Sequence, residues 1–555
     1  MRFFQKLLTK LLVFLSSIVI HSQEVDFHPP IDAPFHLSGT FGEFRSRFHT
    51  GIDFKGGEGI KIFSIEDGYI SRIEVSPYSY GKVVYITHPN GYSSVYAHLS
   101  KFSPDIEEYI KSEQYRSKSF TVKKFPKKDK IQIKRGELLG YSGNTGRSFG
   151  AHLHFEIRDT KSQKIINPML FGLPILDRSE PIINSILIYF ENGKKELKKV
   201  KKLSNDQYSL ENNLIVTEPF NIAVSTIDIL DAAPNKCGVY SIELYVNDSL
   251  FFFNEMTTFS FGETKYINSH IDYEYYKNNN IKMQKCFLDL NNKISTNKKH
   301  TSHPIGTFLK DGTHKITLIV KDSYQNTSSL EFYATFQTKS KTKKTHTLSS
   351  ILINSKQVFE FKKDDCKIYI PNNSLYKDYL FTFKKTHESN MTYPIYTIMN
   401  DSIPSHRNFI ISIEADSIEE GLRPYAIIGR FVDGEIQYVN SKWQDNTITG
   451  YSSYFGDFTI YIDTIKPTIK DLSYYNQSNH LMDNKITFQI SDNVSGIDEY
   501  RAELDGNWIL MEYDYKTGLI EHTIEQDNMI KKQTLTLSVS DKAGNTRNII
   551  ADILR

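Results

Sequence analysis

The chain has 555 residues, too many for one hydrophobic core, so we expect roughly three or four domains of about 100–200 residues each. Its 67 Lys and Arg residues nearly balance its 65 Asp and Glu residues, and this balance predicts no nucleic-acid partner. The 34 Tyr and 36 Phe residues, spread through short segments rich in Ile, Val and Thr, argue against an all-helical protein and predict a mainly β fold.

Residues 1–23 have the layout of an export signal. Basic residues up to Lys10 precede an apolar run from Leu11 to Ile20, and small and polar residues follow up to Gln23. The alternative is an uncleaved membrane anchor, although the run barely reaches the roughly 20 residues that span a bilayer. Both interpretations predict an exported protein of the periplasm or cell envelope, with no membrane span beyond this signal.

Residues 30–175 are dense in glycine turns that separate short β-type runs, such as GYISRIEV and GKVVYIT. This spacing predicts a compact antiparallel β domain. Residues 104–134 interrupt the pattern, because PDIEEYIKSEQYRSKSF has a helix-forming composition and a basic connector follows it. We therefore expect a partly helical insertion at this position.

The segment 152–157 reads His-Leu-His-Phe-Glu-Ile, a strict alternation of polar and apolar residues. On a strand, His152, His154 and Glu156 share one face, and the apolar side chains between them share the other. The apolar face anchors the strand in a core. The histidine face is then free to line a cleft.

Two further segments carry candidate ligands. His49 and Asp53 lie four residues apart in FHTGIDF, where Gly51 and its β-branched neighbours favour a turn that runs into a strand, and His98 ends the alternating run YSSVYAHL. A catalytic zinc takes three protein ligands and keeps a fourth position for water, and His49, Asp53 and one histidine of the 152–157 strand supply such a set. The other two histidines can act as a base for the water and as a donor to the oxyanion or the leaving amine.

The series FHTGIDF, GYISRIEV, YGKVVYITHPNGYSSVYAHL, KRGELLGYSGNTG and GAHLHFEIRD resembles the lysostaphin-like peptidases of family M23, also called LytM-type domains, over about residues 35–170. The resemblance implies a small antiparallel β domain with a substrate groove, in which His49, Asp53 and His154 bind Zn²⁺. It also implies that His98 and His152 act on the water and the tetrahedral intermediate. The insertion at 104–134 is longer than in the simplest members, and we expect it to wall one end of the groove.

The resemblance further implies a zinc metallo-endopeptidase that cuts the peptide stems of bacterial peptidoglycan in cell wall remodelling. Two alternatives remain open. One is a non-catalytic wall-binding scaffold or regulator of other wall hydrolases, which binds a protein partner through its C-terminal β domains. The other is a secreted peptidase that acts on proteins. The complete set of five site residues favours an enzyme.

The rest of the chain predicts further β domains. Residues 180–340 and 464–555 share a weak internal repeat and predict two immunoglobulin-like β-sandwiches, the first enlarged by an insertion around 255–300. Residues 345–463 are β-rich and of no evident type. The Asp clusters of the repeats are able to bind calcium, although turn chemistry alone also explains them.

Cysteine usage gives no metal or disulfide framework. Cys237, Cys286 and Cys366 are widely spaced and odd in number. Cys237 and Cys286 are either bridged within one domain or buried as free thiols.

Overall fold

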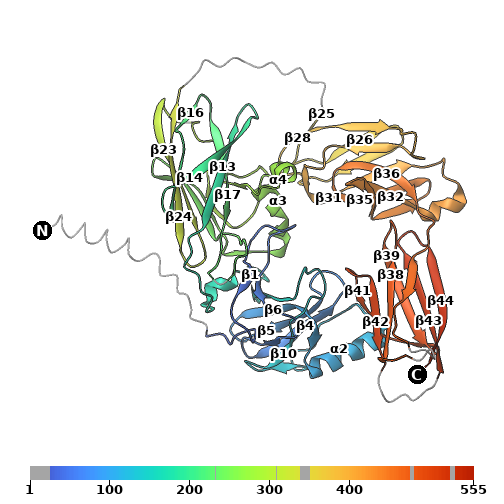
Figure 1. The fold of residues 1–555 in the computed structure, drawn as a ribbon. Helices are drawn as coiled ribbons and strands as arrows, with labels where there is room; N and C mark the ends of the chain where they lie inside the picture. Colours follow the sequence, from blue (N-terminus) through green and yellow to red (C-terminus); the bar gives the residue numbers. More distant parts are fainter. Residues whose placement is uncertain are drawn as a thin grey trace.

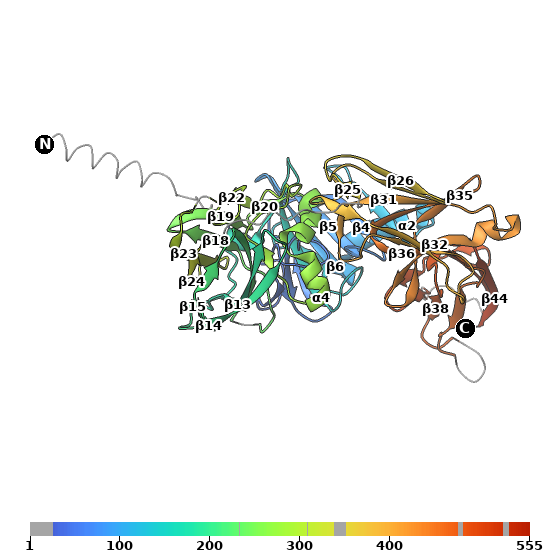
Figure 2. The same ribbon diagram turned by 90° about the horizontal axis from the view of Figure 1, so that it is seen from above.

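The computed structural model describes residues 26–231, 233–307, 309–337, 351–475, 481–524 and 532–554, so the predicted export signal lies outside it. Among these residues, no helix is both long enough and apolar enough to cross a membrane. The fold is mainly β, as predicted. Its β units follow one another around a ring, and the C-terminal unit returns to the N-terminal unit beside helix α2 (Pro104–Ser117) (Figure 1). Seen from above, the green second unit and the red C-terminal unit lie on opposite sides of the blue N-terminal unit (Figure 2).

The N-terminal unit is built on a 10-stranded sheet, whose main path has the strand order β1-β2-β11-β6-β5-β4-β8, and on a 3-stranded sheet of order β3-β10-β7. The strands of the large sheet are β1 (Leu37–Gly39), β2 (Ile52–Lys55), β4 (Gly68–Val75), β5 (Lys82–Thr87), β6 (Tyr92–Leu99), β8 (Val122–Lys124), β9 (Gln132–Ile133), β11 (His152–Asp159), β12 (Ile165–Ile166) and β20 (Thr258–Phe259). Those of the small sheet are β3 (Lys61–Phe63), β7 (Lys101–Phe102) and β10 (Leu138–Tyr141). Strand β11 turns Leu153, Phe155 and Ile157 into the hydrophobic core, so its other face carries the histidines.

The excursion at 104–134 begins with α2 and continues as the short strands β8 and β9. Pro104 starts the helix, and Lys118 ends it in the left-handed conformation. Ile106 and Ile110 are buried in the core of the N-terminal unit. On the outside, the ring of Tyr115 contacts Trp508 of the C-terminal unit at 5.3 Å between centroids. The helix is thus a docking point for that unit, and its place at one end of a groove stays a prediction.

The segment 255–300, predicted as an insertion in the first sandwich, is shared between two units: its first part completes the core of the N-terminal unit, and its short strands at 284–285 and 297–300 pair in the second unit. It contains β20, the 3₁₀ helix η2 (Phe261–Tyr266), α3 (Ile267–His270) and α4 (Tyr273–Asn279). Strand β20 pairs with β12 and so extends the large sheet. Phe259 is fully buried and stacks on Phe41 with 4.6 Å between ring centroids. The N-terminal unit therefore depends on residues more than 200 positions away.

The second unit is an 11-stranded sheet folded over one core, with the order β21-β17-β13-β14-β15-β24-β23-β18-β19-β22 and β16 beside β24. Its strands are β13 (Ile182–Phe190), β14 (Lys195–Lys202), β15 (Gln207–Leu210), β16 (Leu214–Val216), β17 (Phe220–Ile227), β18 (Ser241–Val246), β19 (Ser249–Glu255), β21 (Gln284–Lys285), β22 (Asn297–His300), β23 (Gly312–Lys321) and β24 (Thr327–Phe336). Strand β15 pairs parallel to β24, and so joins the β21-β17-β13-β14 part of the sheet to the β24-β23-β18-β19-β22 part. An immunoglobulin-like topology stays a prediction. Cys237 and Cys286 are buried free thiols, as is Cys366 of the third unit.

The third and fourth units are also built of antiparallel strands. The third contains β25 (Ile351–Ile353) paired with β28 (Tyr379–Phe381), the sheet β26-β27-β31-β35-β34 and the sheet β29-β30-β36-β32-β33. The other elements of this unit are β26 (Phe359–Lys363), β27 (Cys366–Ile370), β29 (Phe383–Thr386), β30 (Ile395–Ile398), β31 (Pro404–Glu414), η3 (Glu420–Tyr425), β32 (Ala426–Val432), β33 (Glu435–Val439), β34 (Ser441–Gln444), β35 (Thr447–Tyr454) and β36 (Gly456–Ile462).

The fourth unit packs the sheets β37-β38-β42-β41 and β40-β39-β43-β44 around one core. Its bounds are β37 (Thr468–Asp471), β38 (Lys485–Ser491), β39 (Ile497–Leu504), β40 (Asn507–Trp508), β41 (Glu512–Asp514), β42 (Leu519–Thr523), β43 (Lys532–Asp541) and β44 (Thr546–Leu554).

Polar contacts close the ring. On one side, Tyr376 of the third unit donates a hydrogen bond to the carbonyl of Lys265 at 2.7 Å. On the other, Lys82 Nζ of the N-terminal unit lies 3.0 Å from Glu512 Oε2 of the fourth. Lys516 donates to the carbonyl of Asn144, in the loop that leads to β11. The C-terminal unit therefore touches a loop that borders the predicted site.

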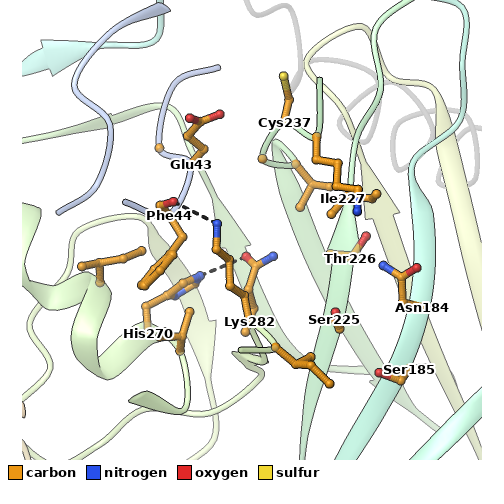
Figure 3. Close-up of a pocket in the computed structure, with 18 of the residues that line it drawn as sticks. Glu43, Phe44, Asn184, Ser185, Ser225, Thr226, Ile227, Cys237, His270 and Lys282 are labelled. Carbon is orange, nitrogen blue, oxygen red and sulfur yellow. Dashed lines mark hydrogen bonds between the residues drawn. The ribbon is translucent and has the colours of Figure 1, made fainter. Parts of the chain in front are cut away.

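A cavity of about 440 Å³ lies between the 42–44 loop of the N-terminal unit and strands β13 and β17 of the second unit (Figure 3). Lys282 crosses it and donates to the carbonyl of Phe44 at 3.3 Å. None of the five residues predicted as catalytic or metal-binding lines this cavity. It separates two units and is distinct from the predicted site.

Candidate active site

Three neighbouring strands bring the predicted residues to one place. Strand β11 lies between β2 and β6, and His154 is in register with Asp53 on one side and with Ala97 on the other. His98 follows Ala97 directly, so Asp53, His98 and His154 lie at the same end of the three strands. His49 precedes β2 in a loop that is held from the other side.

The loop before β2 is fixed by the 255–300 segment. Phe48 is buried, and its N–H donates to the carbonyl of Thr264 at 3.0 Å. The Phe48 ring packs against Phe259 and His270 at 5.6 and 5.5 Å between centroids. The position of His49 thus depends on a segment that is distant in sequence.

One atom from each of His49, Asp53 and His154 converges on a single point. His49 Nε2 lies 3.1 Å from Asp53 Oδ1 and 3.0 Å from His154 Nδ1. His154 Nδ1 lies 2.9 Å from Asp53 Oδ1. The three residues are 5%, 3% and 3% exposed, so the cluster is shielded from bulk water.

The outward atoms of the same three residues are already bonded. His49 Nδ1 donates to the carbonyl of Thr40 at 2.7 Å, and His154 Nε2 donates to Glu156 Oε1 at 3.0 Å. Asp53 Oδ2 accepts from Arg45 at 2.5 Å. Because these outer bonds place the proton of each neutral imidazole on its outward nitrogen, the inward nitrogens and Asp53 Oδ1 are all acceptors.

When both imidazoles are neutral, the three converging lone pairs suit a metal cation, and without a metal a proton on His154 takes its place beside Asp53. Ligand atoms about 2.0–2.1 Å from a tetrahedral zinc lie roughly 3.3 Å apart, close to the separations in this cluster. Two imidazoles and a carboxylate form a ligand set that zinc accepts in catalytic sites. The three residues therefore fit a zinc ion, each with an outer hydrogen bond that fixes its orientation.

His98 and His152 lie beside this cluster, with 5.0 Å between their ring centroids. His98 Nδ1 donates to the carbonyl of Thr145, and His152 Nδ1 donates to that of Gly150, each at 2.8 Å. Their Nε2 atoms remain as acceptors, and His152 Nε2 lies 3.5 Å from Asp53 Oδ1. The structure thus brings all five predicted residues together and leaves two histidines with an inward nitrogen available for proton transfer.

The backbone around His98 is unusual. His98 has a φ of 62°, a left-handed conformation that is uncommon for residues other than glycine and is concentrated at functional sites. The carbonyl it contacts, that of Thr145, lies in a loop packed backbone to backbone on Gly81. A Cβ at Gly146 would lie 2.2 Å from the Gly81 nitrogen, so the glycine spacing of YGK and GNTG permits the close approach.

Comparison with known proteins gives a family match over the part of the chain that contains these residues. Residues 47–116 and 111–168 match Peptidase family M23. The chain contains an M23 domain. A DD-carboxypeptidase/endopeptidase, Mpg, of Neisseria meningitidis is 33% identical over 23% of this chain and 24% of its own length. The peptidoglycan DD-endopeptidase ShyA of Vibrio cholerae is 31% identical over 26% of this chain and 31% of its own length.

The match of the M23 domain thus covers about a quarter to a third of these relatives, and the remaining units lie outside it. A solved structure of a putative peptidase M23 from Pseudomonas aeruginosa is 27% identical, covers 26% of this chain and 50% of that chain, and has a TM-score of 0.20. Residues 350–463 match a Zu5-like domain, which gives a type to the third unit, for which the sequence indicated none.

The pKa values of the histidines in the M23 domain differ, because their charged neighbours differ. Burial opposes the charge of His154, but hydrogen bonds to Asp53 and Glu156 raise its pKa to about 9. Burial, with the neighbouring His154 and His152, lowers the pKa of His98 to about 3. Burial opposes the charge of Asp53 as well, yet His49 and the other histidines hold its pKa well below the usual value. The cluster therefore favours a cation next to Asp53 and a neutral His98.

Behind the M23 site lies a second row of polar residues that the sequence did not indicate as functional. Glu156, fully buried, accepts from Tyr80 at 2.5 Å and from Arg158 Nε at 2.7 Å, and so holds His154 in place. The alternation of the 152–157 strand placed Glu156 on the histidine face, which is a signal for its role. Tyr80 and Arg45 carried no such signal, because their contacts form only in the folded chain.

Proposed function

We propose that the M23 domain is a zinc metallo-endopeptidase that hydrolyses peptide cross-links of bacterial peptidoglycan in cell wall remodelling. The observation that carries this proposal is the convergence of three acceptor atoms beside two histidines with available Nε2 atoms. The peptidoglycan substrate is supported by the matched relatives that are named DD-endopeptidases. An exported location in the periplasm or cell envelope follows from such a substrate.

The residues of the site divide the work of hydrolysis. His49, Asp53 and His154 would hold a zinc ion, which when bound acts as a Lewis acid on the scissile carbonyl and lowers the pKa of water toward about 7. His98 is neutral, and its Nε2 is free to accept a proton from the attacking water. His152, with 15% of its side chain exposed, is the more accessible of the two, and once its Nε2 has taken up a proton it is placed to donate to the oxyanion or the leaving amine.

Removing zinc is expected to abolish cleavage of purified sacculi. Protein treated with phenanthroline, which leaves calcium in solution, should release no muropeptides, and one equivalent of zinc should restore release. Mass spectrometry of the released fragments identifies the bond that is cut. Protein substrates are offered in parallel under the same conditions.

Two results would contradict the proposal. No fragment release from sacculi or proteins, even with zinc bound, would support a non-catalytic scaffold or regulator, whose C-terminal β units bind a protein partner. Cleavage of proteins without cleavage of muropeptides would support a secreted protein peptidase, with the same metal site and a different substrate.

A further inference from the structure

Three carboxylates meet at the base of the second unit, and none of them belongs to the five-residue cluster of the M23 site. Asp177 lies in the linker that enters this unit, Asp228 follows β17 and Asp322 follows β23. One ligand atom from each lies within 4.8 Å of the others. The three residues are 7%, 1% and 1% exposed, so three acidic groups share one buried space.

Turn hydrogen bonds account for only part of this cluster. Asp322 accepts from the backbone and side-chain nitrogens of Asn326 at 2.9 and 2.6 Å. In contrast, Asp177 Oδ2 and Asp228 Oδ1 are buried and have no hydrogen-bond donor in the part of the chain that the structure describes. The neighbouring Arg178 pairs with the more exposed Asp231 instead. A buried carboxylate oxygen without a donor is costly unless a cation or a proton compensates it.

Burial and mutual repulsion raise the pKa values of the carboxyl groups in this cluster. Burial, followed by the charges of Asp177 and Asp322, raises the pKa of Asp228 to about 8. Burial and the charge of Asp322 raise the pKa of Asp177 to about 7. Near neutral pH the cluster must therefore hold either protons or a cation.

The same arrangement occurs a second time, at the base of the C-terminal unit. Asp463, Asp492 and Asp541 also place one ligand atom each within 4.8 Å of the others. Asp463 and Asp541 are 1% and 2% exposed, and Asp492 Oδ1 is buried without a donor among the described residues. Asp492 follows β38 and Asp541 ends β43, as Asp228 and Asp322 follow β17 and β23.

Sequence and hydrogen bonds repeat together in the two clusters. The linker Asp is followed four residues later by proline in both (DRSEP and DTIKP), and the last Asp is followed four residues later by asparagine (DSYQN and DKAGN). Asn326 Nδ2 donates to the carbonyl of Asp177 at 3.2 Å, and Asn545 Nδ2 donates to that of Asp463 at 2.8 Å. Each asparagine thus ties the backbone of the linker aspartate to the unit that follows, which is more than one local turn requires.

We propose that each cluster binds one calcium ion and so fastens the linker to the base of the unit that follows it. Calcium takes six to eight oxygen ligands at about 2.3–2.6 Å, so ligands on opposite sides of the ion lie up to about 5 Å apart. Oxygens within 4.8 Å of one another fit this sphere, and magnesium, which sheds its water reluctantly, is less suited to a buried group of three carboxylates. An all-oxygen set is also unlike the nitrogen-containing set of the M23 site, so the two kinds of site select different metals.

The two junctions hold the ring together. Asp177 joins the N-terminal unit to the second unit, and Asp463 joins the third unit to the fourth. The fourth unit contacts the N-terminal unit through Lys82 and Glu512. Calcium at both junctions therefore stiffens the links that place the C-terminal unit beside the M23 domain.

Calcium binding is tested on the zinc-loaded full chain, which is first freed of calcium and then dialysed against known calcium concentrations. We expect two calcium ions per chain, counted by metal analysis after equilibrium dialysis, at calcium concentrations of about 1–5 mM, the range of weak extracellular sites. The melting temperature should rise by about 5 °C on calcium addition. Asp228→Asn and Asp492→Asn, each at a carboxylate with an oxygen that has no donor, should each leave one bound ion per chain, and the double variant should bind none.

The variants also separate loss of a ligand from loss of the fold. Because each replaces a carboxylate in a repelling cluster by an isosteric amide, their melting temperatures without calcium should equal or exceed that of the parent. Asp248→Asn, at an exposed hairpin turn, should keep both ions and the full shift. A parent protein that binds no calcium at about 5 mM, or Asn variants that still bind two ions, would overturn the proposal, as would equal binding of magnesium.

Discussion

Replacing His154 with alanine is expected to remove zinc and activity together, whereas replacing His152 with alanine should leave zinc bound and still remove most of the activity. His154 supplies one of three converging acceptor atoms, so its loss leaves two ligands. His152 Nε2 lies at the edge of the cluster, 3.5 Å from Asp53 Oδ1. Loss of its proton transfer should lower the rate by about 10²–10⁴-fold. Zinc per chain and the rate of muropeptide release are measured for both variants.

His36→Ala is the matched control, because His36 is exposed and none of its atoms is part of the cluster. This variant should keep full zinc content and activity. If His152→Ala lost zinc as His154→Ala does, or if His154→Ala kept zinc, the division of the two histidines between catalysis and metal binding would be wrong.

The sequence predicted the parts of this protein that depend on local periodicity. Alternation over residues 152–157 predicted the two faces of β11, because a strand repeats every two residues. The spacing of His49 and Asp53 predicted a turn into a strand, and the structure has a loop that leads into β2 at Ile52. The helix-forming composition after Pro104 predicted a helix, and α2 lies there. In each case the signal and the structure fall within the same few residues.

Contacts between distant segments could not be predicted in this way. The packing of Phe259 on Phe41 assigns the first part of the 255–300 segment to the core of the N-terminal unit, although its sequence position favoured the second unit. The contact of Lys516 with the carbonyl of Asn144 closes the ring between residues that are 372 positions apart in the sequence. Amino-acid composition does not indicate which distant segments pack together. The Asp clusters were visible as turn residues, but their convergence from three separate segments was not.

The buried network behind His154 leads to the second large expected effect, for Glu156→Gln. The Glu156 carboxylate accepts from His154 Nε2 and from Arg158, and it is fully buried. The amide keeps the shape but leaves the buried guanidinium of Arg158 without its counter-charge, a loss of about 3–5 kcal/mol in the free energy of unfolding. It also no longer fixes the proton of His154 on Nε2, and zinc affinity should fall by about 10–100-fold.

Tyr80→Phe serves as the control because it removes a hydrogen bond to the same carboxylate without removing the charge. Tyr80 donates to Glu156 at 2.5 Å, and a hydrogen bond to a charged group contributes about 1.5–3 kcal/mol. This variant should be less destabilised than Glu156→Gln and should bind zinc within a few-fold of the parent. Urea unfolding and zinc competition titrations measure the two quantities separately. If both variants weakened zinc binding equally, the network would act on the metal site through packing, and the charge of Glu156 would not be what orients His154.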